Sequence, residues 1–147
     1  MIDHIYLPVT DIDRSLDFYR AVLTPLDSAH RWEFKAHAGW PDLYGFGGDA
    51  PHLWLKGSST SFPELYVAFI ARSEEAVQNA YDAALRHGGT DNGPPGLRPQ
   101  FDPRYYAANV LDPDGYSLEI CFKPWLYLSV GSSAAPSDDP ATSPGRG

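Results

Sequence analysis

A single glutamate interrupts an apolar strand pattern near the end of the chain. In LDPDGYSLEICF, residues 111–122, Glu119 lies between Leu118 and Ile120. Strand side chains alternate between the two faces of a sheet, so Glu119 points away from these apolar neighbours. Such a carboxylate either faces water or lines a pocket. In a pocket it could act as a general base and accept a proton from a carbon acid.

The same alternation brings two further polar side chains to this face. In IDHIYLPV, the apolar side chains would cover a helix, which leaves His4 and Tyr6 on the opposite face. In ELYVAFIA, the alternation leaves Tyr66 and Ala68 opposite the helix. We therefore expect His4, Tyr66 and Glu119 to share the surface that the helices leave uncovered. The phenol of Tyr66 could stabilise an oxyanion formed beside Glu119.

The elements that would position these side chains occur twice. IDHIYLPV predicts a strand, and TDIDRSLDFYRAVLTPL predicts a helix with Asp11 as its N-cap. ELYVAFIA and SEEAVQNAYDAALRHGG repeat this order, with Ser73 as the cap. Aligning the sequence of the first strand with that of the second pairs Asp11 with Ser73 and Tyr19 with Tyr81. The match of caps and apolar positions predicts a duplicated β-α-β-β-β unit. The apolar stripe expected for the second helix comprises Val77, Ala80, Tyr81, Ala84 and Leu85.

The remaining strands follow from short apolar runs between turn residues. RWEFKA, DLYGFG and HLWLKG predict three antiparallel strands within residues 26–57. TDNGPPGLRP predicts a turn-rich loop, and DPDG joins RYYAANVL to YSLEICF. Pro113 suits a type I turn and Gly115 the left-handed position that follows it. The sequence therefore predicts an α+β fold of two such modules.

Composition limits the partners of this chain. Nineteen acidic and eleven basic residues leave a net charge of -8, and without a basic cluster we expect no nucleic-acid or membrane partner. The chain shows no leader-like segment and has one cysteine, Cys121, so we expect a cytoplasmic protein in which this thiol is a packing residue. Residues 124–130 form an apolar extension, and the composition of residues 131–147 predicts a disordered tail.

Three stretches carry a resemblance to a known family: DHIYLPVTDIDRSLDFY, the second unit from YVAFIA to GLRP, and YYAANVLDPDGYSLEI. Together they resemble the vicinal oxygen chelate superfamily, which includes glyoxalase I, bleomycin-resistance proteins, fosfomycin-resistance transferases and extradiol dioxygenases. The resemblance implies a glyoxalase-like domain over residues 1–123, built from modules 1–57 and 64–123. It further implies that the paired modules form a cupped mixed sheet with helices outside.

The resemblance also implies a metal site in the cup. Its positions correspond to His4, Tyr66 and Glu119, and the metal would be Zn, Mn, Ni or Fe. Tyr66 stands where relatives carry histidine, and a phenol is a poor ligand at neutral pH. A weak or absent metal is therefore the alternative. In the first module, Trp54 lies where the final strand could supply a second carboxylate ligand. If the register of that strand differs, His52 is the candidate ligand instead.

Three functions remain open from the sequence. The first is a metal-dependent lyase, isomerase or thiol transferase acting on a small oxygenated compound. The second is a metal-free binding protein of the bleomycin-resistance type, and the third is a metal-free enzyme with Glu119 and Tyr66 as catalytic residues. The expected ligand contacts are Trp32, Trp54, Arg98, Tyr105 and Tyr106, with Arg98 as an anion anchor. The family pairs modules within one chain or between subunits, so a homodimer is also open.

Overall fold

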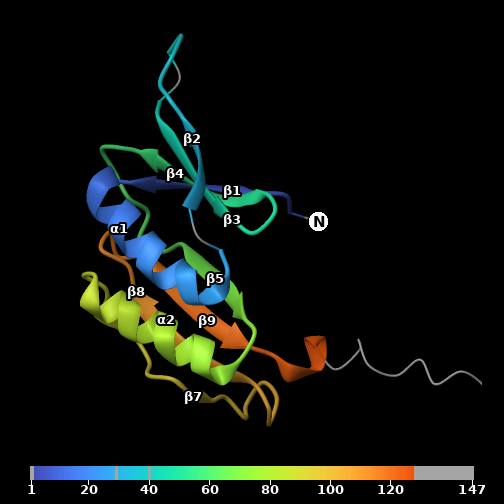
Figure 1. Cartoon of the computed structure of the whole chain (residues 1–147). Helices are drawn as coiled ribbons and strands as arrows, with labels where there is room; N and C mark the ends of the chain where they lie inside the picture. Colours follow the sequence, from blue (N-terminus) through green and yellow to red (C-terminus); the bar gives the residue numbers. More distant parts are fainter. Residues whose placement is uncertain (1, 29, 40, 128–147) are drawn as a thin grey trace, which may run out of the picture.

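The computed structural model describes residues 2–28, 30–39 and 41–127 (Figure 1). The predicted tail and residues 128–130 of the apolar extension lie outside the described residues. The part of the extension that is described contains a short 3-10 helix, η2 (Pro124–Leu126).

The first module forms one four-stranded sheet and a helix. Its elements are β1 (Ile5–Val9), α1 (Ile12–Leu23), η1 (Thr24–Leu26), β2 (His30–Phe34), β3 (Leu43–Gly47) and β4 (Pro51–Gly57). The strands lie in the order β1-β4-β3-β2, with β1 parallel to β4. This arrangement is the predicted β-α-β-β-β unit.

The second module repeats the arrangement. Its elements are β5 (Tyr66–Ala71), α2 (Glu74–Arg86), β6 (Thr90–Asp91), β7 (Gly96–Leu97), β8 (Tyr106–Leu111) and β9 (Ser117–Phe122). The order is β5-β9-β8-β6, β7 also pairs with β8, and β5 is parallel to β9. The predicted α+β fold of two modules with mixed sheets is therefore confirmed. One detail differs, because the loop TDNGPPGLRP contains the short strands β6 and β7.

The two helices cover the sheets and contact each other, as Figure 1 shows. Each begins at its predicted cap: Asp11 Oδ1 accepts a hydrogen bond from Arg14 N at 3.1 Å, and Ser73 Oγ accepts one from Ala76 N at 3.1 Å. The predicted stripe of α2 is buried except at Leu85, which is 39% exposed. The prediction for Leu85 was wrong because its side chain lies at the edge of the stripe, while Ala83 is buried instead.

The DPDG turn joins the second module to the first. Asp112 is buried and accepts hydrogen bonds from Tyr19 Oη at 2.7 Å and from the backbone N–H of Tyr116 at 2.8 Å. Asp114 accepts bonds from Thr10 and from Arg14 Nη2, the latter at 3.0 Å. Gly115 adopts φ +89, as the turn requires. The turn is therefore a structural connection between the modules.

Because the side chain of Asp112 is buried, we expect the free energy of unfolding to depend on pH. Burial raises the pKa of Asp112 above its ordinary value, although three hydrogen bonds oppose the shift. A raised folded-state pKa contributes stability below the unfolded pKa, and this contribution is lost as pH rises through the folded pKa. Relative to Asp112→Asn, the wild type should therefore gain stability as pH falls through that value. Urea denaturation of both proteins between pH 3 and 7 measures the two free energies of unfolding. A difference between them that does not change with pH would contradict the prediction.

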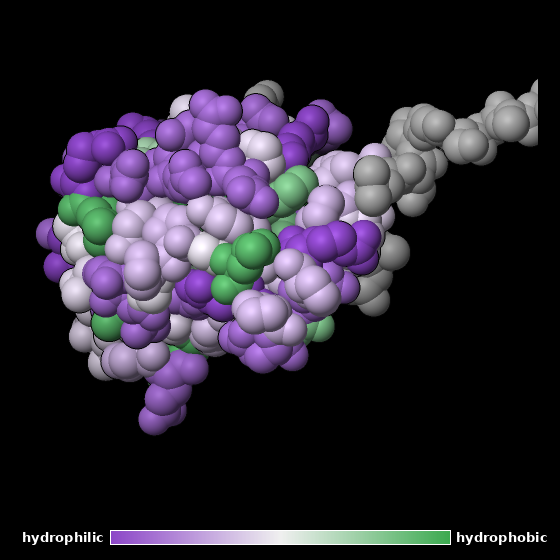
Figure 2. Space-filling view, turned by 90° about the horizontal axis from the view of Figure 1, so that it is seen from below, coloured by the Kyte–Doolittle hydropathy of each residue, from purple (hydrophilic) through white to green (hydrophobic). Residues whose placement is uncertain are grey.

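The face of the molecule seen from below is mainly polar (Figure 2). Seen from below, most of the surface is hydrophilic, and the hydrophobic residues on that face stand in separate small groups (Figure 2). Within the described part of the chain, neither helix has the length and apolar character needed to cross a bilayer.

Candidate functional site

Glu119 lies at the centre of a hydrogen-bonded group on the sheet face of the second module that α2 leaves open. Tyr66 Oη donates to Glu119 Oε2 at 2.8 Å, and Tyr105 Oη donates to Glu119 Oε1 at 2.9 Å. Asn109 Nδ2 donates to Tyr66 Oη at 3.1 Å. We call these four residues the Glu119 cluster. Strands β5, β9 and β8 supply Tyr66, Glu119 and Asn109, and Tyr105 directly precedes β8.

Both tyrosines of the cluster are hydrogen-bond donors at neutral pH. Burial raises the pKa of Tyr66, and the hydrogen bond to Glu119 raises it further. Burial likewise raises the pKa of Tyr105, with Cys121 and Glu119 adding to the shift. Neither phenol therefore ionises readily. A carboxylate has about four acceptor positions, so Glu119 retains acceptor capacity beyond its two phenol bonds.

Three aromatic rings border the Glu119 cluster, and we call Phe101, Tyr105 and Trp125 the aromatic wall. The ring centroid of Tyr105 lies 5.5 Å from that of Phe101 and 6.4 Å from that of Trp125. Phe101 is 71% exposed, so a planar molecule could contact this wall from solvent. Arg98 is adjacent, because its backbone N–H donates to the carbonyl of Tyr105 at 2.7 Å.

The corresponding face of the first module is apolar. In the strand register, Trp32 lies opposite Gly45, Gly45 opposite Trp54, and Trp54 opposite Tyr6. The indole of Trp54 covers Gly45, where an added Cβ would lie 2.8 Å from a ring carbon. The ring of Phe34 lies 5.5 Å from that of Trp54. This face offers aromatic contact area for a flat ligand, and Asp3 and His4 lie at its border.

The register explains the difference between the two modules. Tyr6 pairs with Trp54 in the first module, and Ala68 pairs with Glu119 in the second. Alignment of the two modules matches Tyr6 with Ala68, so Trp54 occupies the position that corresponds to Glu119. Similarly, Gly45 pairs with Trp54 where Asn109 pairs with Glu119. One module therefore carries a packed indole where the other carries a hydrogen-bonded carboxylate.

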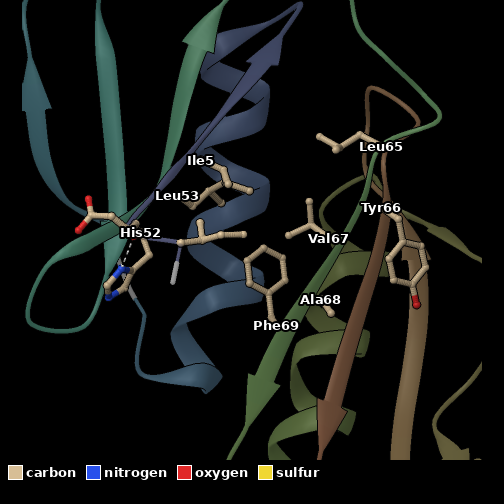
Figure 3. A pocket seen from close by; sticks show the side chains of 10 residues that line it. Ile5, His52, Leu53, Leu65, Tyr66, Val67, Ala68 and Phe69 are labelled. Carbon is tan, nitrogen blue, oxygen red and sulfur yellow. Dashed lines mark hydrogen bonds between the residues drawn. The ribbon is translucent and has the colours of Figure 1, made fainter. Parts of the chain in front are cut away.

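A cleft of about 440 Å³ separates the edge strands β1 and β5. Ile5 and Leu53 line one side, and Val67 and Phe69 extend toward them from the other (Figure 3). The backbone of Tyr66 borders the cleft, while its ring points away from Val67 and Phe69 (Figure 3). The cleft is thus mainly apolar, and the phenol of Tyr66 belongs to the open face beside it.

The residues that the resemblance implied for a metal do not form one donor set. His4 Nδ1 lies 2.6 Å from Asp3 Oδ1, and its ring packs edge-on against Tyr6 at 5.3 Å. Both oxygens of Glu119 accept phenol hydrogen bonds instead. In the described ranges, no three His, Cys, Asp or Glu side chains are arranged to hold a metal ion. In this arrangement His4 is bonded to Asp3, while Tyr66 and Glu119 are bonded to each other.

The structure brings together only some of the residues proposed from the sequence. Glu119, Tyr66 and Tyr105 form the cluster, and Arg98 lies beside it. Trp32, Trp54 and His4 lie on the first module, and His52 Nδ1 contacts the carbonyl of Asp3 at 2.9 Å. Tyr106 is 9% exposed and lies on the helix side, where its hydroxyl accepts a hydrogen bond from Gln78 at 2.8 Å. The structure thus places Tyr106 away from the cluster.

Sequence reasoning missed Asn109, Phe101 and Trp125. A signal existed for Asn109, because the DPDG turn sets the hairpin register that pairs Asn109 with Glu119. That register also places Tyr105 on the open face and Tyr106 on the other. Phe101 and Trp125 lie outside regular strands, so no side-chain alternation could indicate their direction.

Comparisons with known proteins support this description of the fold. The family model for the Glyoxalase/Bleomycin resistance protein/Dioxygenase superfamily matches residues 1–120. A glyoxalase/bleomycin resistance protein from Albidiferax ferrireducens is 24% identical with a TM-score of 0.71, over 82% of this chain and 98% of that one. No curated protein matches this sequence.

Two further solved structures share the fold at lower identity. A glyoxalase I mutant from Zea mays is 19% identical with a TM-score of 0.65, over 81% of this chain and 44% of that one. The fosfomycin resistance protein FosX from Mesorhizobium loti is 14% identical with a TM-score of 0.59, over 82% of this chain and 89% of that one. With its two β-α-β-β-β modules and the family match over residues 1–120, the chain belongs to the Glyoxalase/Bleomycin resistance protein/Dioxygenase superfamily.

Proposed function

We propose that this protein binds a small organic molecule at the Glu119 cluster without needing a metal ion. The observation that carries the proposal is the pair of phenol bonds to Glu119, one to each carboxylate oxygen. These bonds fix the carboxylate while leaving acceptor positions for an N–H or O–H of a ligand. Glu119 then serves as the ligand's hydrogen-bond acceptor.

The surroundings of the cluster favour this function. Tyr66 is 53% exposed and Phe101 is 71% exposed, so a ligand can reach both the polar cluster and the aromatic wall. Binding sites for small molecules commonly combine apolar and aromatic surface with a few placed polar groups. A metal at Glu119 would have to replace the two phenol bonds and recruit ligands from elsewhere. Binding of the kind named in bleomycin resistance therefore requires less rearrangement than metal-dependent lyase or transferase chemistry.

Metal titration gives the first test. Wild type and Glu119→Gln should show no saturable binding of Zn(II), Mn(II), Ni(II) or Fe(II) in the micromolar range by calorimetry. Protein purified without chelators should hold no stoichiometric metal by elemental analysis. Stoichiometric metal that is lost in Glu119→Gln would instead make Glu119 a metal ligand and overturn the proposal.

Ligand binding gives the second test. Thermal denaturation with EDTA present can be followed with bleomycin, fosfomycin and the hemithioacetal of glutathione and methylglyoxal as probes. At 100 times its Kd, a bound probe stabilises the folded state by about 2.7 kcal/mol, which raises Tm by several degrees. The shift should fall in Glu119→Gln and Tyr66→Phe but persist in Tyr6→Phe, a matched change on the first module. A shift seen only after metal addition would contradict the proposal.

A further inference from the structure

The loop between β6 and β7 holds the guanidinium of Arg98 in place. Arg98 Nη2 donates to the carbonyl of Pro94 at 2.9 Å. An added Cβ at Gly93 would lie 3.6 Å from Nη2, and one at Gly96 would lie 3.3 Å from Nη1. The backbone at Gly93 and Gly96 therefore lies next to the guanidinium. Arg98 is half-buried, and this contact fixes it beside Tyr105.

A second cation lies on the other side of Tyr105. Lys123 Nζ is 5.3 Å from the centroid of the Tyr105 ring. The pairing of Tyr106 with Phe122 places Lys123 opposite Tyr105 on the open face. Arg98 reaches the same face from the β7 side of β8. The aromatic wall is therefore bordered by positive charge on both sides.

Neither cation is neutralised by the described chain. Arg14, Lys35, Arg72 and Arg104 each lie within ion-pair distance of a carboxylate. In residues 2–28, 30–39 and 41–127, Arg98 and Lys123 have no such partner. The protein carries a net charge of -8, so the positive charge of these two side chains is opposite in sign to that of the chain as a whole. A ligand with negative charge would complement them.

We infer that the ligand of the Glu119 cluster carries an oxyanion on a planar, unsaturated body. The oxyanion, such as a carboxylate, sulfonate or phosphate, binds Arg98, because charge-assisted hydrogen bonds to arginine are strong and directional. Lys123 adds positive charge on the other side of Tyr105. The planar body contacts the aromatic wall of Phe101, Tyr105 and Trp125. This inference rests on the proposed function, since it assigns a chemical class to the molecule bound at that cluster.

Two probes that differ only in charge test the inference. Naphthalene-2-carboxylate carries the anion, while naphthalene-2-carboxamide is neutral and offers N–H donors to Glu119. By calorimetry at low salt, the carboxylate should bind wild type at least tenfold more tightly than the carboxamide. Arg98→Ala should weaken carboxylate binding at least tenfold and leave carboxamide binding unchanged. Arg98→Lys keeps the charge without the planar fork and should give an intermediate loss. Arg86→Ala, at the end of α2, is the matched control and should change neither affinity.

Glu119→Gln separates this inference from the proposed function. Glu119→Gln should weaken carboxamide binding, because the charged acceptor for the N–H groups of this probe is lost. If Arg98→Ala leaves carboxylate binding unchanged while Glu119→Gln weakens the carboxamide, the anion inference is wrong and the proposed function stands. If neither variant changes the binding of either probe, both are wrong.

Discussion

Replacing Asp112 by alanine should lower the free energy of unfolding by about 3–5 kcal/mol, a large part of the stability of a small domain. The side chain is 4% exposed and accepts hydrogen bonds from Tyr19 Oη and from the backbone N–H groups of Asp114 and Tyr116. Alanine leaves these donors without their acceptor, and each unsatisfied buried group costs about 1–3 kcal/mol. Urea denaturation followed by tryptophan fluorescence measures the change.

Two variants control for this result. Asp112→Asn keeps one oxygen acceptor, so it should cost about 1–2 kcal/mol and less than alanine. Asp49→Ala removes an exposed carboxylate from the β3–β4 turn and should lie within about 0.5 kcal/mol of wild type. An Asp112→Ala protein as stable as Asp49→Ala would show that the DPDG turn does not hold the modules together.

Replacing Gly45 by valine should cost about 3 kcal/mol and displace the indole of Trp54. A Cβ at position 45 would lie 2.8 and 2.9 Å from two ring atoms of Trp54 and 3.0 Å from Cβ of Pro51. Trp54 is only 7% exposed, so its ring cannot move aside without losing buried contacts. Overpacking of this kind typically costs about 1–3 kcal/mol. Thermal denaturation gives the loss of stability, and near-ultraviolet circular dichroism reports the changed indole environment.

Gly57→Val is the matched control for this substitution. Gly57 lies at the end of β4, and an added Cβ there meets no atom within 4 Å. It should therefore leave both stability and the near-ultraviolet spectrum close to those of wild type. Equal stability of the two variants would mean that Trp54 does not pack on Gly45.

Much of the fold was predictable because its signals are local. Side-chain alternation assigned His4, Tyr66 and Glu119 to the open faces, and the caps Asp11 and Ser73 marked both helix starts. The DPDG turn fixed the hairpin that ends the chain's second sheet. These features depend on near neighbours in the sequence.

The candidate site was less predictable because it depends on how separate elements meet. Alternation gives the face of His4 but not the distance between the two sheets, and the structure leaves His4 beside Asp3. Adjacent tyrosines in RYYAANVL cannot share a face. The hairpin register shows that Tyr105 is the one on the open face, where its hydroxyl bonds to Glu119. The contact between Arg98 and the GPPG segment depends on a loop conformation that no periodicity encodes.

The connection through the DPDG turn determines how the two halves of the molecule can move. In the described chain, the hydrogen bonds between the modules all involve residues 112–116, while an exposed ion pair of Arg72 and Asp27 at 3.6 Å is the other polar link. Exposed ion pairs contribute little, so the turn supplies most of the polar connection, while α1 and α2 pack on each other in one shared apolar core. A rotation of one module on the other would therefore have to slide α1 along α2 as well as bend the turn. The turn and the helix pair together set the width of the cleft that Ile5 and Phe69 border.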